Sequence, residues 1–142
     1  MKIICLVFIV LLSTTESFAQ SLTYKVTEIK MFNYSSSKDD FIPVDSTYPE
    51  GVYAYFDDNK ISVNDQCHSN YYLSGRPEIK EYPTYVTSKW NANDESKNDC
   101  LVMFQIINPG DNESQVKLLY VMYKKVLLLY KINPVEKGLM SL

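Results

Sequence analysis

The stretch NDQCHSNYY places Cys67 directly beside His68, which is the only histidine in the chain. A thiolate nucleophile usually relies on an imidazole base, and both groups are common metal ligands. Neighbours on a strand point to opposite faces, however, and a catalytic pair is normally assembled from distant residues. Because there is no second histidine, Cys67 has no other imidazole partner. We therefore predict no catalytic residue and no metal site at this stretch.

The N-terminus has the three-part pattern of a secretory signal peptide. Lys2 precedes an apolar run over residues 3–12, polar residues follow, and the small residues Ser17 and Ala19 stand at the positions of an A-x-A-like cleavage site. The run is too short to cross a bilayer, which takes about 20 residues. We expect residues 1–19 to be cleaved, and residues 20–142 to form a single β-rich domain that is secreted or periplasmic.

Export determines how the cysteines are interpreted. Cys5 lies inside the predicted signal peptide, so the mature chain keeps Cys67 and Cys100. Two cysteines in an exported protein most simply pair with each other. The closed loop would hold about 30 residues, for which chain entropy gives on the order of 3–4 kcal/mol of stabilisation. The sequence therefore predicts a disulfide between Cys67 and Cys100, with His68 as a polar residue beside it.

Charge and motifs exclude several classes of function. The net charge is −3 and the lysines are scattered, which argues against nucleic acid and against an anionic lipid surface. The acidic segment NANDESKND has Ser96 where a calcium-binding EF-hand loop needs glycine, and Val102 where it needs glutamate. The sequence also contains no G-x-S-x-G, S-x-x-K or H-E-x-x-H motif. We expect no cofactor, and no transmembrane segment in the mature chain.

Aromatic residues are the remaining candidates for function. Tyrosine and tryptophan offer a large rigid surface with a polar tip, which suits binding sites. Many of them must face the interior or a neighbouring strand of a sheet. The candidate binding surface comprises Tyr71, Tyr72, Tyr82, Tyr85 and Trp90.

The elements that would position these residues are mostly β, with turn residues at short intervals. Residues 22–32 alternate, residues 52–63 indicate a hairpin, and residues 33–51 suggest a long connection. Pro77 and Pro83 bracket an expected loop, and residues 84–90 form a further strand. The segment CLVMFQII is apolar at every position except Gln105, which predicts a central strand covered on both faces.

The segment QVKLLYVMYKKVLLLYKI, residues 115–132, has two interpretations. It can form two strands that meet near Lys124 and Lys125, or one amphipathic helix with Lys117, Lys124 and Lys131 near one face. We favour the hairpin because the preceding strands need partners. The predicted fold is a small, single-domain, antiparallel β-sandwich or barrel-like sheet, with one C-terminal helix as the alternative.

These observations favour a non-catalytic binding or interaction module. Its expected partner is an extracellular or envelope protein, or a glycan. A secreted hydrolase that uses turn carboxylates such as Asp94 or Asp99 is the first alternative, because acid–base carboxylates need no local motif. A secreted inhibitor or effector that acts through a loop is the second alternative.

Overall fold

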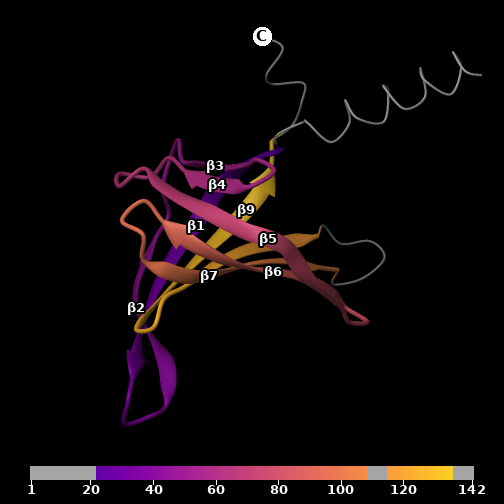
Figure 1. The fold of residues 1–142 in the computed structure, drawn as a ribbon. Helices are drawn as coiled ribbons and strands as arrows, with labels where there is room; N and C mark the ends of the chain where they lie inside the picture. The colour runs from indigo at the N-terminus through magenta and orange to yellow at the C-terminus, as the bar shows by residue number, and fades with distance from the viewer. Residues whose placement is uncertain (1–21, 109–114, 136–142) are drawn as a thin grey trace, which may run out of the picture.

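The computed structural model describes residues 22–108 and 115–135 (Figure 1). In these two ranges the chain forms strands joined by turns, with no helix. The strands are β1 (Leu22–Ser35), β2 (Asp40–Thr47), β3 (Tyr53–Phe56), β4 (Lys60–Val63), β5 (Ser69–Glu81), β6 (Tyr85–Asp94), β7 (Asp99–Ile107), β8 (Val116–Met122) and β9 (Val126–Pro134).

The strands close into an antiparallel barrel because the long β1 has partners on both sides. One side of β1 pairs with β9 from Tyr24 to Asn33. The other side pairs first with β3 and then, from Ile29 onward, with β2. Strands β3 to β9 pair in chain order, so eight strands form the barrel and β2 is an additional strand on β1. Figure 1 shows the β1–β2 hairpin projecting away from the other strands.

The core is the inside of this barrel. Successive side chains on a strand alternate between its two faces, so every second residue points inward. An eight-stranded barrel is just wide enough for side chains to fill its interior. An aromatic cluster packs edge-on at 5.0–5.1 Å, Tyr24 on Phe56 and Phe56 on Phe104. The buried residues are Tyr24, Val26, Ala54, Ile61, Val63, Tyr71, Ala92, Cys100, Val102, Leu119, Val121, Tyr130 and Ile132.

The predicted all-β antiparallel fold is confirmed, in its barrel form. Residues 115–132 form the β8–β9 hairpin, and the helical alternative is wrong. The Tyr123 amide donates to the Val126 carbonyl at 2.8 Å, which closes the turn around Lys124 and Lys125.

Two expected connections are strands instead. Residues 33–47, most of the expected connection over 33–51, belong to the β1–β2 hairpin, whose turn contains Asp39 at a positive φ of 49°. Pro77 lies within β5, and not in a loop, because a register shift between Ser74 and Glu78 lets the strand resume pairing with β6. Proline is tolerated there because it occupies an irregular edge position, where the missing N–H breaks no ladder bond.

The predicted signal peptide, residues 1–19, lies outside the described residues. Within residues 22–108 and 115–135, no helix is long and apolar enough to cross a membrane.

Candidate interaction surface

Cys67 and Cys100 are both free thiols in the structure, so the predicted disulfide is not present. Cys67 is exposed in the β4–β5 loop, whereas Cys100 points into the barrel from β7 and is buried. The inward direction of Cys100 follows from the alternation of β7, which also buries Val102. The two thiols therefore occupy different environments, one in solvent and one in the core.

Cys67 and His68 line a shallow polar pocket of about 140 Å³. It lies where the β4–β5 loop meets the β6–β7 turn and Tyr123. His68 has a positive φ of 46°, and its amide donates to the Asp65 carbonyl at 3.1 Å, as expected of a tight turn. No group of three or more His, Cys, Asp or Glu residues in the described part of the chain could hold a metal ion.

The carboxylates of the hydrolase alternative are occupied by turn contacts. Asp94 accepts hydrogen bonds from the Asn98 amide at 2.9 Å and from the Tyr123 hydroxyl at 3.0 Å. Burial by itself would raise the pKa of Asp94, but these hydrogen bonds outweigh it and hold that pKa below its usual value. Asp99 accepts a hydrogen bond from the Asn93 amide group at 2.7 Å. Both carboxylates thus stabilise the β6–β7 hairpin.

The five aromatic residues of the predicted binding surface do not lie on one surface. Tyr71 is buried in the core, with its hydroxyl 3.2 Å from that of Tyr130. Trp90 packs against the core from the inner face of β6. Tyr72 is exposed on the outer face of β5. Only Tyr82 and Tyr85 come together, stacked at 4.5 Å between ring centroids, beside the β5–β6 turn.

The stacked tyrosines line a groove of about 290 Å³ on the outside of β5, β6 and β7. Glu78 lies in this groove between Lys80 and Lys89, at 3.4 Å from each ammonium group. The charges of Lys89 and then Lys80 lower the pKa of Glu78. Met103 and Gln105 of β7 line the same groove. The groove thus has an aromatic end, a charged side, and a third side formed by one apolar and one polar residue of β7.

The outer face of β7, β8 and β9 is apolar. On β7, β8 and β9 the residues between the buried positions point away from the barrel. Each is partly exposed, except for the exposed Lys131, and all but Gln105 and Lys131 are apolar or aromatic. We call this surface the outer wall, and it comprises Leu101, Met103, Gln105, Ile107, Val116, Leu118, Tyr120, Met122, Leu127, Leu129 and Lys131.

The strand register arranges the outer wall into rows. Leu127, Met122 and Leu101 lie side by side across the three strands. The next row consists of Leu129, Tyr120 and Met103. Lys30 of β1 and Lys89 of β6 stand at the two ends of that second row. The apolar centre is therefore bounded by charge on both sides.

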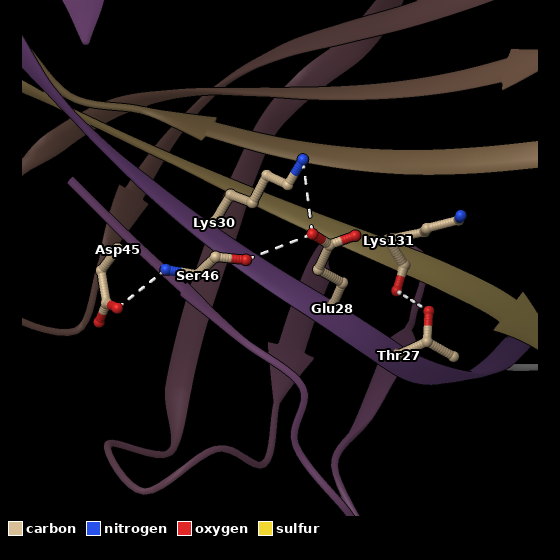
Figure 2. Close-up of polar contacts among 6 residues, drawn as sticks. All are labelled: Thr27, Glu28, Lys30, Asp45, Ser46 and Lys131. Carbon is tan, nitrogen blue, oxygen red and sulfur yellow. Dashed lines mark hydrogen bonds and ion pairs between the residues drawn. The ribbon is translucent and has the colours of Figure 1, made fainter. Parts of the chain in front are cut away.

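The boundary on the β1 side is a second charged cluster (Figure 2). Glu28 lies 3.4 Å from the Lys30 ammonium and accepts a hydrogen bond from Ser46 at 3.3 Å. Lys131 pairs with Glu28 in the strand register, yet its ammonium points away in Figure 2 and makes no ion pair within the described ranges. Between this cluster and the wall is a groove of about 230 Å³, whose lining includes Val116, Leu118 and Leu129 of the wall.

The outer wall could have been predicted from the pattern of apolar residues in three segments, and not from the positions of the aromatic residues. In VKLLYVM and VLLLYKI, as in CLVMFQII, apolar residues occur at odd-numbered and at even-numbered positions, and hence on both faces of a strand. For CLVMFQII this pattern predicted a strand covered on both faces. The structure covers the inner face with the barrel core, and nothing in the described residues covers the outer face.

No family model, curated protein or solved structure matches this chain.

Proposed function

We propose that this chain is a small exported interaction module, without catalytic activity, that binds a partner protein through the outer wall. The observation that carries the proposal is the apolar surface across β7, β8 and β9, bounded on both sides by lysine–glutamate clusters. Large apolar patches with polar rims mark sites of interaction in soluble proteins.

The centre of the wall has the composition of a protein interface. Tyrosine and methionine are enriched at interface centres, and the wall contains Tyr120, Met103 and Met122. The Tyr120 hydroxyl donates to the Gln105 side chain at 3.3 Å, so the hydroxyl keeps a partner if water is excluded. Tyrosine is neutral at physiological pH, and burial raises the pKa of Tyr120 further from it.

A glycan is the alternative partner, and a different part of the surface favours it. Sugar rings stack on exposed aromatic side chains, and the stacked pair of Tyr82 and Tyr85 lies at the far end of the groove beside β5. The polar groups needed to orient a sugar are present in Glu78, Lys80 and Gln105. A protein would contact the wall, whereas a glycan would contact the tyrosine end of the groove.

The test is a binding screen of the purified mature chain against extracellular and envelope proteins and against a glycan panel. Leu118→Lys places a charge at the centre of the wall. Leu22→Lys is the matched control, because Leu22 is 55% exposed at the start of β1, next to β3.

We expect a protein ligand whose affinity falls at least about tenfold with Leu118→Lys and is unchanged with Leu22→Lys. A ligand that binds both variants equally well would contradict the proposal. A glycan whose binding depends on Tyr82 would support the alternative, and hydrolysis of a screened compound that requires Asp94 or Asp99 would favour an enzyme.

A further inference from the structure

We infer that the groove of about 290 Å³ beside Tyr82 and Tyr85, which we call the tyrosine groove, binds an anionic sugar, a saccharide ring that carries a carboxylate or a sulfate group. The inference deepens the glycan alternative raised with the proposed function, because it names the class of glycan and the residues that select it. It does not require that the outer wall bind a protein. The shape of the groove, its hydrogen-bond donors and its charge all support an anionic sugar.

The strand register explains why this surface is hollow. The lining residues alternate along β5, β6 and β7, so their side chains share the outer face. With Ile107 they form three rows across the strands: Glu78–Lys89–Met103, Lys80–Thr87–Gln105 and Tyr82–Tyr85–Ile107. Thr87 stands at the centre and has the shortest side chain of the set. The longer side chains around it therefore form the walls of the groove, with the Thr87 hydroxyl between them.

The tyrosine row provides a surface on which a ring can stack. The Tyr82 amide donates to the Tyr85 carbonyl at 2.8 Å across the β5–β6 turn, which holds the two residues side by side. Their rings are 4.5 Å apart between centroids, with 22° between the ring planes. Tyr82 is exposed, so aromatic surface remains open at the end of the groove. The C–H face of a saccharide ring can pack against this surface.

Next to the tyrosines, the groove is rich in hydrogen-bond donors. Each lysine ammonium has three N–H groups, and Glu78, at 3.4 Å from both Lys80 and Lys89, occupies only part of them. The Tyr120 hydroxyl donates to the side-chain oxygen of Gln105 at 3.3 Å, which leaves the side-chain NH₂ group of Gln105 for a ligand. These donors suit the oxygen atoms of an anionic group and of sugar hydroxyls.

The charge of the groove favours an anion. Two ammonium groups and one carboxylate give its lining a net charge of +1. The charges of Lys89 and then Lys80 lower the pKa of Glu78, which stays ionised and competes with a ligand anion for the two lysines. A neutral sugar would leave both ammonium groups without a ligand partner. An aromatic acid without hydroxyl groups would leave Thr87 and Gln105 without one.

The test is an NMR titration of the isotope-labelled mature chain with two kinds of anionic sugar, each up to about 10 mM, because an open surface groove binds weakly. One arm uses an oligosaccharide of galacturonic acid, with its methyl ester as the matched neutral ligand. The other arm uses a sulfated galactan oligosaccharide, with the unsulfated form as its neutral match.

We expect the amide signals around Thr87 to shift with an anionic ligand and not with its neutral match. The affinity should fall as salt rises from about 50 to 500 mM, because exposed charges are screened. The arm that binds identifies the anionic group as carboxylate or sulfate.

Glu78→Gln should strengthen binding of the anionic sugar by about 1.5- to 5-fold, because it removes the competing carboxylate. A residue that only stabilised the fold would not produce such a gain. Glu81→Gln is the matched control, since Glu81 is exposed on the same strand but points to its other face. It changes the net charge equally and should leave the affinity unchanged. Lys89→Gln should weaken binding by a factor similar to the gain.

The stacking surface has its own pair of variants. Tyr82→Ala should weaken binding of the anionic sugar by several-fold, up to about tenfold. Tyr72→Ala is the control, because Tyr72 is also an exposed tyrosine on the outer face of β5 but does not line the groove. The NMR spectrum of each variant shows whether it is folded.

Several outcomes would overturn the inference. They are equal binding of the charged and neutral oligosaccharides, no shift with either anion up to about 10 mM, and no gain from Glu78→Gln over Glu81→Gln. If the groove binds no sugar while Leu118→Lys abolishes binding of a protein, the proposed function stands and this inference fails. If an anionic sugar binds as described while Leu118→Lys affects no protein ligand, the inference stands and protein binding through the wall fails.

Discussion

Two tyrosine hydroxyl groups lie buried inside the barrel and depend on each other for a hydrogen bond. Tyr71 and Tyr130 are 2% and 1% exposed, and their hydroxyls are 3.2 Å apart in a barrel interior that is otherwise apolar. Each hydroxyl is the hydrogen-bond partner of the other. A buried polar group that loses its partner costs more than the bond itself contributed.

This mutual hydrogen bond predicts similar effects of two substitutions. Tyr71→Phe and Tyr130→Phe should each lower the free energy of unfolding by about 1–3 kcal/mol, because either change leaves the other hydroxyl buried without its partner. Urea unfolding measures both variants, with Tyr55→Phe at an exposed position as the control. A cost no larger than that of the control would show that the two buried hydroxyls do not depend on each other.

The same tyrosine predicts a loss of stability in alkali. Burial, then the neighbouring Tyr71, raise the pKa of Tyr130 well above 10.0. Below pH 10 both folded and unfolded chains keep the proton, so this contribution to stability is fully present. Above pH 10 the unfolded chain loses the proton while the folded chain keeps it. The free energy of unfolding should then fall by up to about 1.4 kcal/mol per pH unit for this group. Tyr130→Phe should make the decline between pH 10 and 11.5 shallower, and an unchanged slope would argue against the assignment.

The two free thiols should differ in reactivity. Burial, with the negative charges of Asp94 and Asp99, raises the pKa of Cys100 to about 11. At pH 8 only about one Cys100 thiol in a thousand is ionised, and the thiolate is the reactive form. Titration with a disulfide reagent should therefore find one fast thiol, Cys67, in the folded chain and two in urea. Cys67→Ser should remove the fast reaction. If neither the folded chain nor the chain in urea reacts, Cys67 and Cys100 are joined by a disulfide in the protein from its native host.

At the scale of the elements, turns set the register of the hairpins. The β6–β7 turn closes with the Asp94 amide donating to the Asn98 carbonyl at 3.1 Å, and Lys97 within it has a positive φ of 65°. The β8–β9 turn contains Lys124 and Lys125, neither of which has a positive φ. A side chain with a Cβ is strained in the left-handed region, and glycine is not.

This contrast predicts opposite effects of one substitution at two turns. Lys97→Gly should raise the free energy of unfolding by about 0.5–1 kcal/mol, because it relieves the left-handed strain. Lys124→Gly should lower it by a similar amount, because glycine there only adds freedom to the unfolded chain. Thermal unfolding of the two variants gives the signs. Destabilisation by both would indicate that the Lys97 side chain contributes more than its backbone strain costs.

At the scale of the whole molecule, closure leaves little free sheet edge. The exposed edges in the described residues are the far side of β2 and the part of β5 beyond Tyr72, which pairs only with β6. Each contains a proline, Pro43 on β2 and Pro77 on β5. Proline lacks an N–H and does not template the pairing of another strand, so both edges are protected from aggregation.

Removing this protection should promote aggregation with little change in stability. Pro43→Thr is expected to speed the rise of light scattering on gentle heating, while the free energy of unfolding shifts by no more than about 0.5 kcal/mol. Pro83→Thr, in the β5–β6 turn, is the control because that proline lies at no free edge. Equal scattering from both variants would mean that the β2 edge is not the site of aggregation.

Much of the fold could be predicted from the sequence because it depends on local pattern. Alternation in residues 22–32, the hairpin around Asp57 and Asp58, and the paired segments on either side of Lys124 correspond to β1, β3–β4 and β8–β9. The two expected connections that are strands instead contain local irregularities, a positive φ at Asp39 and the register shift in β5. Such irregularities depend on pairing partners that are distant in the sequence.

The sequence by itself thus determined that this chain is built of antiparallel strands with an apolar core, because period and turn chemistry act over a few residues. Only the tertiary structure decided which face each residue occupies. It placed Tyr71 and Trp90 inside, brought Tyr82 and Tyr85 together, and kept Cys100 in the core away from solvent. It also left Leu118, Tyr120 and Leu129 outside, because a closed barrel has a single interior and cannot bury both faces of its strands.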